Sequence, residues 1–316
     1  MAPRPTTCSA PGKLFLFGEY AVLSGGQAIV TAVDRRVFAT RHMAASVYRA
    51  HGTEGLALPR LVLEAVESTA RVEHLETDVR ALFDGPNKLG LGSSAASTVA
   101  LCAAVLAYEA EGKLDRDAVF RASFAAHCRL QRGRGSGGDV ACSTYGGTLA
   151  YSMSEPWRPL QTPQALELRA IWTGESASST ALVDCVEQAR KARPAEIERA
   201  LSAIADVADQ ASDAIEDAAW SELIALFALG DDAMERLGIA SEAPIITARH
   251  RALRTLAGRY GAVVKPSGAG GGDFSLAVGE QVDWEGFAQE LPNGCQLMDL
   301  ALGAHGVRVA QRLSER

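Results

Sequence analysis

Three glycine-rich segments, far apart along the chain, limit what this sequence can fold into more than any other feature. They span residues 88–96, 132–139 and 265–273. Glycine lets a chain turn tightly and approach a bound group closely, so each segment predicts a loop. Each loop also carries Ser, Lys or Arg, in a chain whose net charge is -7. Three such loops favour a site for a polyphosphate over three ordinary turns.

Size and composition bear on how many domains the chain forms and which partners it can bind. With 316 residues, 47% of them hydrophobic, the chain can bury two adjoining cores. Pro156, Pro159 and Pro163 mark a change in composition, and we expect domains at 1–160 and 161–316. The acidic balance argues against nucleic acid and acidic membranes as partners, because both need a basic protein surface.

Two features of the sequence bear on where the protein resides. The N-terminal residues lack the apolar core of a signal peptide, and the most apolar stretch, 95–108, is too short to span a bilayer. We therefore expect a cytoplasmic protein with no membrane partner, present as a monomer or a homodimer.

Hydrophobic periodicity and chain breakers predict the elements around the loops. We expect strands at 14–17, 28–33, 147–152, 166–172, 261–265, 274–278 and 306–310. We expect helices at 58–72, 94–111, 116–131, 180–193, 195–215, 220–237 and 243–258. Helices and strands mixed without strict alternation predict an α+β fold.

The first loop has the composition of a phosphate-binding turn. Gly90 and Gly92 open it, and Ser93 and Ser94 can cap the following helix or offer hydroxyls to phosphate or Mg²⁺. The positive end of that helix adds to the attraction for an anion. An ordinary Gly-Ser helix cap would have the same local sequence, so this loop alone leaves both interpretations open.

Two other nucleotide-binding motifs compete with this interpretation of the loop. The pattern G-x-x-x-x-G-K-[ST] does not occur in the chain. Residues 90–95 fit a loose G-x-G-x-x-A dinucleotide fingerprint, with Glu109 and Glu111 about twenty residues further on. These acids fall at the end of the same predicted helix, whereas a dinucleotide fold needs them after a second strand. A dinucleotide-dependent oxidoreductase is therefore the weaker alternative.

The second and third loops add charge. Residues 132–139 contain Arg132 and Arg134 and end at Asp139, which could equally be a solvated basic turn with a capping aspartate. Residues 265–273 lie between two predicted strands and could form only a wide turn.

Taken in order, residues 10–23 (Ala-Pro-Gly-Lys-Leu-Phe-Leu-Phe-Gly-Glu-Tyr-Ala-Val-Leu), 90–96 and 265–273 resemble the three signature motifs of the galactokinase, homoserine, mevalonate and phosphomevalonate (GHMP) kinase superfamily. The resemblance implies an N-terminal domain similar to the second domain of ribosomal protein S5 and a ferredoxin-like C-terminal domain. It also implies an active site between them, ATP and Mg²⁺ as cofactors, and a small phosphorylated acid as substrate.

The residues of this chain that occupy the positions of the family motifs are the site residues that the resemblance implies. ATP binding is implied for Lys88, Gly90, Leu91, Gly92, Ser93, Ser94 and Ala95, with Ser94 also a ligand of Mg²⁺. Substrate binding is implied for Tyr20, Arg132, Arg134, Ser136, Gly137, Ser179, Lys265, Ser267, Gly268, Ala269 and Gly270. Lys13 and Asp139 are the expected catalytic residues.

Within the superfamily the chain is most similar to the phosphomevalonate kinase branch. The triplet Gly18-Glu19-Tyr20 replaces the Gly-Glu-His usual in mevalonate kinases, and residues 120–132 hold no acidic side chain for the Mg²⁺-ligating Glu of that branch. The run 132–139, the final Gly272-Asp273, and Trp172-Thr173 followed by Ser178-Ser179 also resemble the phosphomevalonate branch. Mevalonate kinase, another alcohol-phosphorylating relative, and a non-catalytic metabolite sensor remain the alternatives.

The implied reaction transfers the γ-phosphoryl group of ATP to a phosphate oxygen of 5-phosphomevalonate in isoprenoid biosynthesis. Because that oxygen is already an anion, catalysis should depend on alignment and charge neutralisation. Lys13 would bridge the acceptor and the γ-phosphate, and Asp139 would orient Lys13. Arg132 and Arg134 would supply the positive charge that a phosphorylated acceptor needs.

Overall fold

The computed structural model describes residues 5–43, 49–51, 55–164 and 166–310. Contacts divide the chain into two compact units. The first contains Met1–Lys13, Ala32–Gly147 and Gly303–Arg316, and the second contains Leu14–Thr31 and Thr148–Leu302. The chain therefore crosses between units within strands β1 (Thr6–Phe17) and β2 (Gln27–Arg41). Residues 1–4, at the start of the N-terminal segment that lacks the apolar core of a signal peptide, lie outside the described residues.

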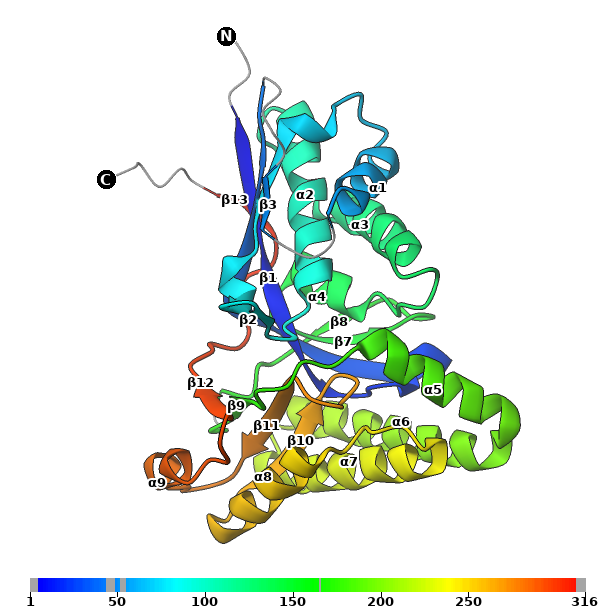
Figure 1. Cartoon of the computed structure of the whole chain (residues 1–316), viewed down its shortest axis with the longest axis vertical. Coiled ribbons are helices and arrows are strands. Elements are labelled where there is room, and N and C mark those ends of the chain that lie inside the picture. The colour runs from blue at the N-terminus through cyan, green and yellow to red at the C-terminus, as the bar shows by residue number, and fades with distance from the viewer. Residues whose placement is uncertain (1–4, 44–48, 52–54, 165, 311–316) are drawn as a thin grey trace. The chain divides into compact units, whose positions relative to one another are not determined.

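The first unit has a sheet with helices on one side (Figure 1). The strand order is β13-β1-β2-β4-β3, where β13 is Arg308–Val309, β4 is Leu75–Asp78 and β3 is Arg49–His51. The helices are α1 (Ala57–Ala65), α2 (Ser93–Glu109), α3 (Arg116–Leu130) and α4 (Gly138–Tyr145). A short hairpin, β5 (Phe83–Asp84) and β6 (Asn87–Lys88), leads into the first glycine-rich loop. Short 3₁₀ turns occur at Val72–His74 and Arg80–Leu82.

Helix α2 is the buried axis of this unit. Its sequence is apolar on every side, and residues such as Leu101 and Val105 are fully buried. A helix that is apolar all round is stable only when other elements surround it, and α1, α3 and α4 pack against it. Its N-terminus is consequently held in a fixed place at the first glycine-rich loop.

The second unit combines an antiparallel sheet with a layer of long helices. The sheet order is β10-β11-β9-β12, with β10 at Val263–Ser267, β11 at Phe274–Val278, β9 at Arg169–Trp172 and β12 at Gln296–Met298. The helices are α5 (Ser179–Ala192), α6 (Pro194–Glu216), α7 (Trp220–Ser241), α8 (Ala248–Arg259) and α9 (Trp284–Gln289). The remaining elements are the 3₁₀ turn Ala21–Ser24, β7 (Thr148–Ser152) and β8 (Arg158–Leu160).

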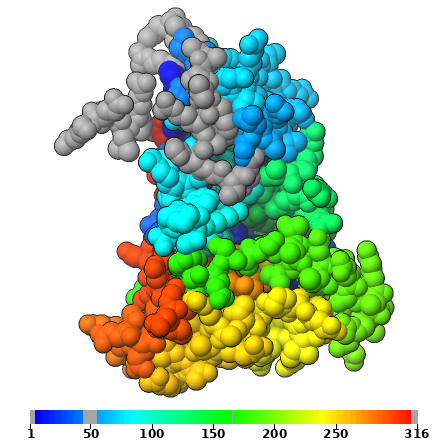
Figure 2. Space-filling view, in the orientation of Figure 1, coloured from blue at the N-terminus to red at the C-terminus, as the bar shows by residue number. Residues whose placement is uncertain are grey.

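The helices of the second unit have their own core. Its members include Ile197 of α6 and Met234 and Leu237 of α7, all completely buried. Figure 2 shows the outer surface of α7 and α8 in yellow. Strand β7 pairs with the N-terminal part of β2, with Ile29 opposite Ala150.

The structure confirms the expected α+β class and corrects several boundaries. Residues up to 139 were expected to be loop because of their glycines, yet α4 begins at Gly138. Gly137 adopts a left-handed φ of 87° as the residue before the helix, so the glycines start the helix instead of excluding it. Similarly, α8 begins at Ala248 and not at 243, because Thr247 caps it by accepting a hydrogen bond from the His250 amide.

The observed bounds of other elements differ from the expected ones by a few residues. Helix α7 continues past Gly238 to Ser241, and α1 ends at Ala65, well before residue 72. The strands expected at 14–17 and 28–33 are the ends of longer strands. Elements that the patterns missed include β4, β8, β12 and α9, which are all short.

No helix in the described part of the chain is long and apolar enough to cross a membrane. The expected domains at 1–160 and 161–316 stay a prediction, since the two compact units are each built from separate segments of the chain.

Candidate active site

Strand β1 runs directly beside the first glycine-rich loop. The amide of Lys13 donates a hydrogen bond of 2.9 Å to the carbonyl oxygen of Leu91. A Cβ atom on Gly12 would come within 2.9 Å of the same oxygen. The close approach of strand and loop therefore requires glycine at position 12, and it fixes the backbone of Lys13 to the loop.

The side chain of Lys13 lies across Gly92. A Cβ atom on Gly92 would be 2.9 Å from Cε and 3.0 Å from Cγ of Lys13, and Gly92 has a φ of 72°. Both facts exclude a larger residue there. Lys13 is only 9% exposed, so its ammonium group is held at the loop instead of moving through solvent.

The N-terminus of α2 follows Gly92 immediately. Ala96 is the residue whose amide donates back to Gly92, at 3.0 Å. The amides of Ser93, Ser94 and Ala95 precede that first helical bond, and Gly92 has no side chain with which to cap them. Helix amides of this kind, together with the positive end of the helix dipole, form a site for an anion.

A second helix begins in the same unit at the end of the second glycine-rich segment. Asp139 lies in the first turn of α4, where its Oδ1 accepts a hydrogen bond of 2.9 Å from the Val140 amide. Ser136 accepts a bond of 3.3 Å from the Gly138 amide through its hydroxyl. Ser136 and Gly137 thus shape the start of α4 and the position of Asp139.

Lys13 and Asp139 both act electrostatically on one buried thiol. Burial raises the pKa of Cys142, the positive charge of Lys13 lowers it, and the negative charge of Asp139 raises it. Cys142 is completely buried in α4. The structure therefore brings the two expected catalytic residues into one region, beside the N-terminus of α2.

The other predicted residues of this unit are less enclosed. Arg132 and Arg134 are exposed in the turn after α3, where Arg132 has a φ of 56° and its amide donates to the Arg129 carbonyl. Lys88 is half-buried at the end of β6, opposite Phe83.

The third glycine-rich segment lies in the second unit, where its polar groups are used internally. Lys265 is fully buried, and its ammonium donates to Glu19 Oε1 at 2.5 Å and to the Pro266 carbonyl at 2.7 Å. The hydroxyl of Ser267 accepts a bond from the Phe15 amide and donates one to the Phe15 carbonyl, both 2.9 Å. Ser267 thereby occupies both backbone groups of Phe15.

Tyr20 joins the same segment. Its hydroxyl donates a hydrogen bond of 2.7 Å to the carbonyl oxygen of Ala269, and burial raises its pKa. Gly268 and Gly270 have φ values of 86° and 76°, and the Gly271 amide donates to the Ile245 carbonyl at 2.8 Å. These contacts join residues 15–20 to residues 265–271 within one unit.

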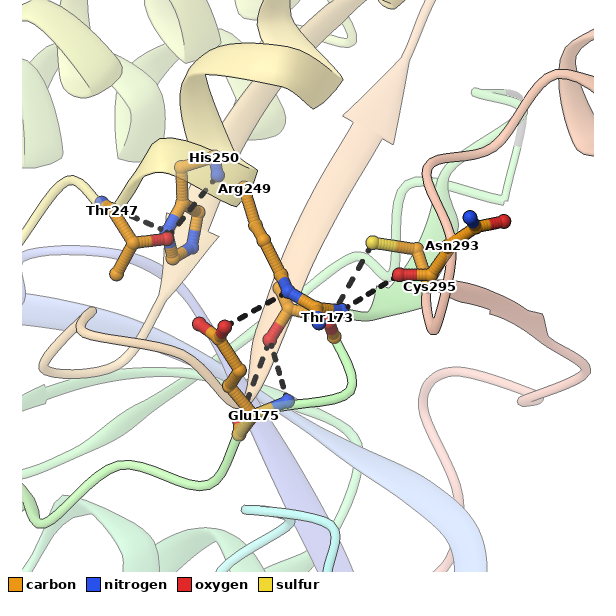
Figure 3. A network of polar contacts seen from close by, with 7 residues as sticks. All are labelled: Thr173, Glu175, Thr247, Arg249, His250, Asn293 and Cys295. Carbon is orange, nitrogen blue, oxygen red and sulfur yellow. Dashed lines mark hydrogen bonds and ion pairs between the residues drawn. The ribbon is translucent and has the colours of Figure 1, made fainter.

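Figure 3 shows a network of polar contacts around Arg249 and Thr173. Arg249 at the start of α8 donates to the carbonyls of Thr173 (2.6 Å) and Asn293 (3.0 Å) and pairs with Glu175 (2.9 Å). The Thr173 amide in turn donates to the carbonyl of Asp273, the last residue of the segment. Arg249 was not expected from the sequence, because nothing local to α8 indicates that it reaches two loops.

Asp273 also holds the segment that leads to Ser179. Its Oδ1 accepts a hydrogen bond of 3.2 Å from the Ala177 amide. Ser178 caps α5 by accepting from the Ala181 amide at 3.3 Å, and Ser179 is exposed as the first residue of that helix. Ser178 therefore serves as an ordinary helix cap, and the substrate-binding role of Ser179 stays a prediction.

The oxygen ligands in the first unit suit a magnesium ion that arrives with a nucleotide. No group of three or more His, Cys, Asp or Glu side chains among the described residues could hold a metal ion by itself. Mg²⁺ in kinases is bound by few protein ligands together with phosphate oxygens. Ser94, half-buried in the first turn of α2, and Asp139 could supply such ligands.

The dinucleotide alternative does not fit this geometry. The strand before the loop is the two-residue β6, and Glu109 is the last residue of α2 itself. The acid therefore does not follow a second strand, as that fold requires.

Comparison with known proteins agrees with the motifs. Residues 60–147 match the model of the GHMP kinases N terminal domain. A phosphomevalonate kinase from a Streptomyces species is 31% identical over 85% of this chain and 88% of that protein. A mevalonate kinase from Archaeoglobus fulgidus is 32% identical over 86% of this chain and 93% of that protein.

A solved structure supports the fold. Streptococcus pneumoniae phosphomevalonate kinase, in complex with phosphomevalonate and AMPPNP, matches with a TM-score of 0.78 at 20% identity, over 94% of this chain and 99% of that one. At this identity the similarity shows the fold alone, and the family rests on the two sequence relatives. The expected resemblance is confirmed: the chain belongs to the GHMP kinase family of ATP-dependent phosphotransferases.

Proposed function

We propose that this protein is a GHMP kinase of the mevalonate pathway and, more specifically, a phosphomevalonate kinase. It transfers the γ-phosphoryl group of Mg-ATP to 5-phosphomevalonate, giving diphosphomevalonate and ADP. The observation that carries the phosphoryl-transfer part is the side chain of Lys13 lying across Gly92 at the N-terminus of α2.

The first unit supplies the groups that hold the nucleotide phosphates. Amides of Ser93, Ser94 and Ala95 donate to phosphate oxygens, and the ammonium group of Lys13 neutralises charge that builds up on the transferred group. Ser94 would help to hold Mg²⁺, which would supply further charge neutralisation when bound with the nucleotide. Leu91 keeps Lys13 in place through its carbonyl oxygen.

The acceptor oxygen of a phosphate monoester is an anion at neutral pH, so it needs no strong base. The carboxylate of Asp139 orients Lys13 and the acceptor in this reaction. An alcohol acceptor would instead require Asp139 to accept a proton during transfer. The two acceptors therefore place different demands on the same residue.

Positive charge in the segment that leads to Asp139 favours the phosphorylated acceptor. Helix α3 carries Asp117 in its first turn as its one acidic residue, and that carboxylate accepts a hydrogen bond of 2.8 Å from Tyr145. The exposed Arg132 and Arg134 follow the helix and supply positive charge. Phosphate recognition uses this kind of arginine, whereas mevalonate carries no phosphate to pair with it.

A side-by-side assay of the two acceptors tests the proposal. ADP release by the purified protein is measured with Mg-ATP and either phosphomevalonate or mevalonate, at several concentrations of each. We expect kcat/KM for phosphomevalonate to exceed that for mevalonate by at least about 100-fold. A preference for mevalonate would make the protein a mevalonate kinase, and turnover of neither acceptor would favour a metabolite sensor.

Single arginine variants test the charge argument separately. Arg132→Ala and Arg134→Ala are each compared with wild type for KM of phosphomevalonate and KM of ATP. We expect at least one variant to raise the KM of phosphomevalonate by about tenfold, the cost of one charged hydrogen bond. Unchanged KM in both variants would remove the charge argument.

A further inference from the structure

A buried hydroxyl on α4 reaches out of its own helix to strand β1. Ser143 is completely buried, and its Oγ donates a hydrogen bond of 2.9 Å to the carbonyl oxygen of Pro11. Serine hydroxyls inside helices usually bond to a carbonyl one turn earlier in the same helix. Ser143 instead donates its hydrogen bond to the strand that carries Lys13.

The position of Ser143 on α4 relates it to Asp139. The two residues are four positions apart, so they lie on the same face of the helix, one turn from each other. Pro11 is likewise two residues before Lys13 in the same strand. One hydrogen bond therefore connects the helix that carries Asp139 to the strand that carries Lys13.

The same strand is also held at the first glycine-rich loop. The Lys13 amide bonds to Leu91, and Gly12 packs against the same residue. These contacts tie the strand to the loop before α2, and through them α4 is held to the strand indirectly, by its packing on α2. The Ser143 bond adds a direct restraint between α4 and the strand.

We propose that Ser143 is a positioning residue that fixes the separation of the Lys13 ammonium group and the Asp139 carboxylate during phosphoryl transfer. This inference rests on the proposed function only in taking Lys13 and Asp139 as the catalytic pair. A misplacement of catalytic groups by about 1 Å can slow a reaction by about 100-fold. Ser143 touches neither nucleotide nor acceptor in this account.

The neighbouring residue provides a matched control. Thr144 is also completely buried, but its hydroxyl donates to the Val140 carbonyl, 2.8 Å away in the same helix. Thr144→Val removes a buried hydroxyl without touching the strand. Ser143→Ala removes the bond to Pro11, and Ser143→Thr keeps that donor while adding a methyl group to a packed site.

Steady-state kinetics distinguish a positioning role from a merely structural one. We expect Ser143→Ala to lower kcat by roughly 10- to 100-fold with both KM values within about twofold of wild type. Thr144→Val should keep wild-type kcat. Ser143→Thr should lower Tm yet keep more kcat than Ser143→Ala. Equal kcat in Ser143→Ala and Thr144→Val would overturn the proposal.

A second measurement does not depend on turnover. Pyridoxal phosphate, an aldehyde with a phosphate group, labels accessible lysines after borohydride reduction, and peptide mass spectrometry gives the rate at Lys13. We expect labelling to be at least about threefold faster in Ser143→Ala than in wild type or Thr144→Val, because the strand is freed. Identical rates in all three would contradict the positioning role. Failure of wild type to turn over either acceptor would contradict only the proposed function.

Discussion

The first and third glycine-rich loops have similar compositions, but their polar groups differ: those of the first lie at the start of a helix, and those of the third bond within the protein. In the first, the amides of Ser93, Ser94 and Ala95 precede the first helical hydrogen bond, and Lys13 lies over the loop. In the third, Lys265 is paired with Glu19 and Ser267 bonds twice to Phe15. A glycine-rich sequence thus indicates a turn. Backbone amides that make no hydrogen bond within their helix are what indicate a phosphate site.

This difference suggests different roles for the two lysines of the motifs. Lys13 should contribute mainly to the rate of reaction, and Lys265 mainly to the stability of its unit. Variants at both positions separate these roles.

The largest expected effect is on catalysis at the first loop. Lys13→Met should lower kcat by roughly 10²–10³-fold, because it removes the charge that stabilises the transferred group, while Tm stays near wild type. Asp139→Asn should retain more activity than Lys13→Met if the acceptor is a phosphate. A larger loss at Asp139 would indicate an alcohol acceptor and would point to mevalonate kinase.

The third loop should respond in stability. Lys265→Met leaves the carboxylate of Glu19 buried without its partner, and we expect the free energy of unfolding to fall by about 3–5 kcal/mol in urea titrations. The double variant Lys265→Met with Glu19→Gln removes both charges and should recover part of that loss. A double variant less stable than Lys265→Met would show that the pair is not the cause.

Glycine substitutions sharpen the comparison at the first loop. Gly92→Ala would place a methyl group 2.9 Å from Lys13 Cε and strain a φ of 72°, so we expect kcat/KM for ATP to fall by about 100-fold. Gly112 has a φ of 90° and nothing within 4 Å of a Cβ atom, so Gly112→Ala carries the strain alone. Equal kinetics in the two variants would argue against the close contact with Lys13.

The smallest expected effect is a pH dependence of stability in the second unit. Burial, followed by the charges of Arg254, Arg251 and Lys265, lowers the pKa of His250 from 6.5 to about 4. The unfolded chain binds the proton first as pH falls, so this stability is present above pH 6.5 and is lost on acidification towards pH 4. Between pH 7 and 5 the loss should be roughly 1–2 kcal/mol.

The control for this prediction is His250→Asn, which removes the titrating ring. Its free energy of unfolding should change less between pH 7 and 5 than that of wild type. An equal slope in both proteins would assign the pH dependence to other groups, such as Glu235, whose pKa is held below its usual value by a hydrogen bond from Arg254.

Elements with a clear local cause were predictable from the sequence. Helix α2 was expected at 94–111 and runs from Ser93 to Glu109, because its alanines and leucines favour a buried helix and Gly112 ends it. Strand β11 was expected at 274–278 and has these bounds. Helix α4 was missed because glycine can also precede a helix in a left-handed conformation, as Gly137 does.

Those site residues that belong to a local sequence motif could be predicted from the sequence. Lys13, Gly92 and Asp139 came from three separate motifs, and the structure groups them in the first unit. Partners distant in sequence, such as Glu19 for Lys265 and Pro11 for Ser143, depend on tertiary packing. Lys265 was expected to bind substrate; it is completely buried and paired with Glu19, and its substrate-binding role stays a prediction.

The central claim is that the amides at the start of α2 hold the phosphates of the nucleotide. Amide NMR spectra of ¹⁵N-labelled protein, titrated with Mg²⁺ and a non-hydrolysable ATP analogue, test it most directly. We predict that the signals of Ser93, Ser94 and Ala95 shift strongly and saturate together, and that Gly92→Ala weakens the binding. Saturation of binding with these three signals unmoved would contradict the account.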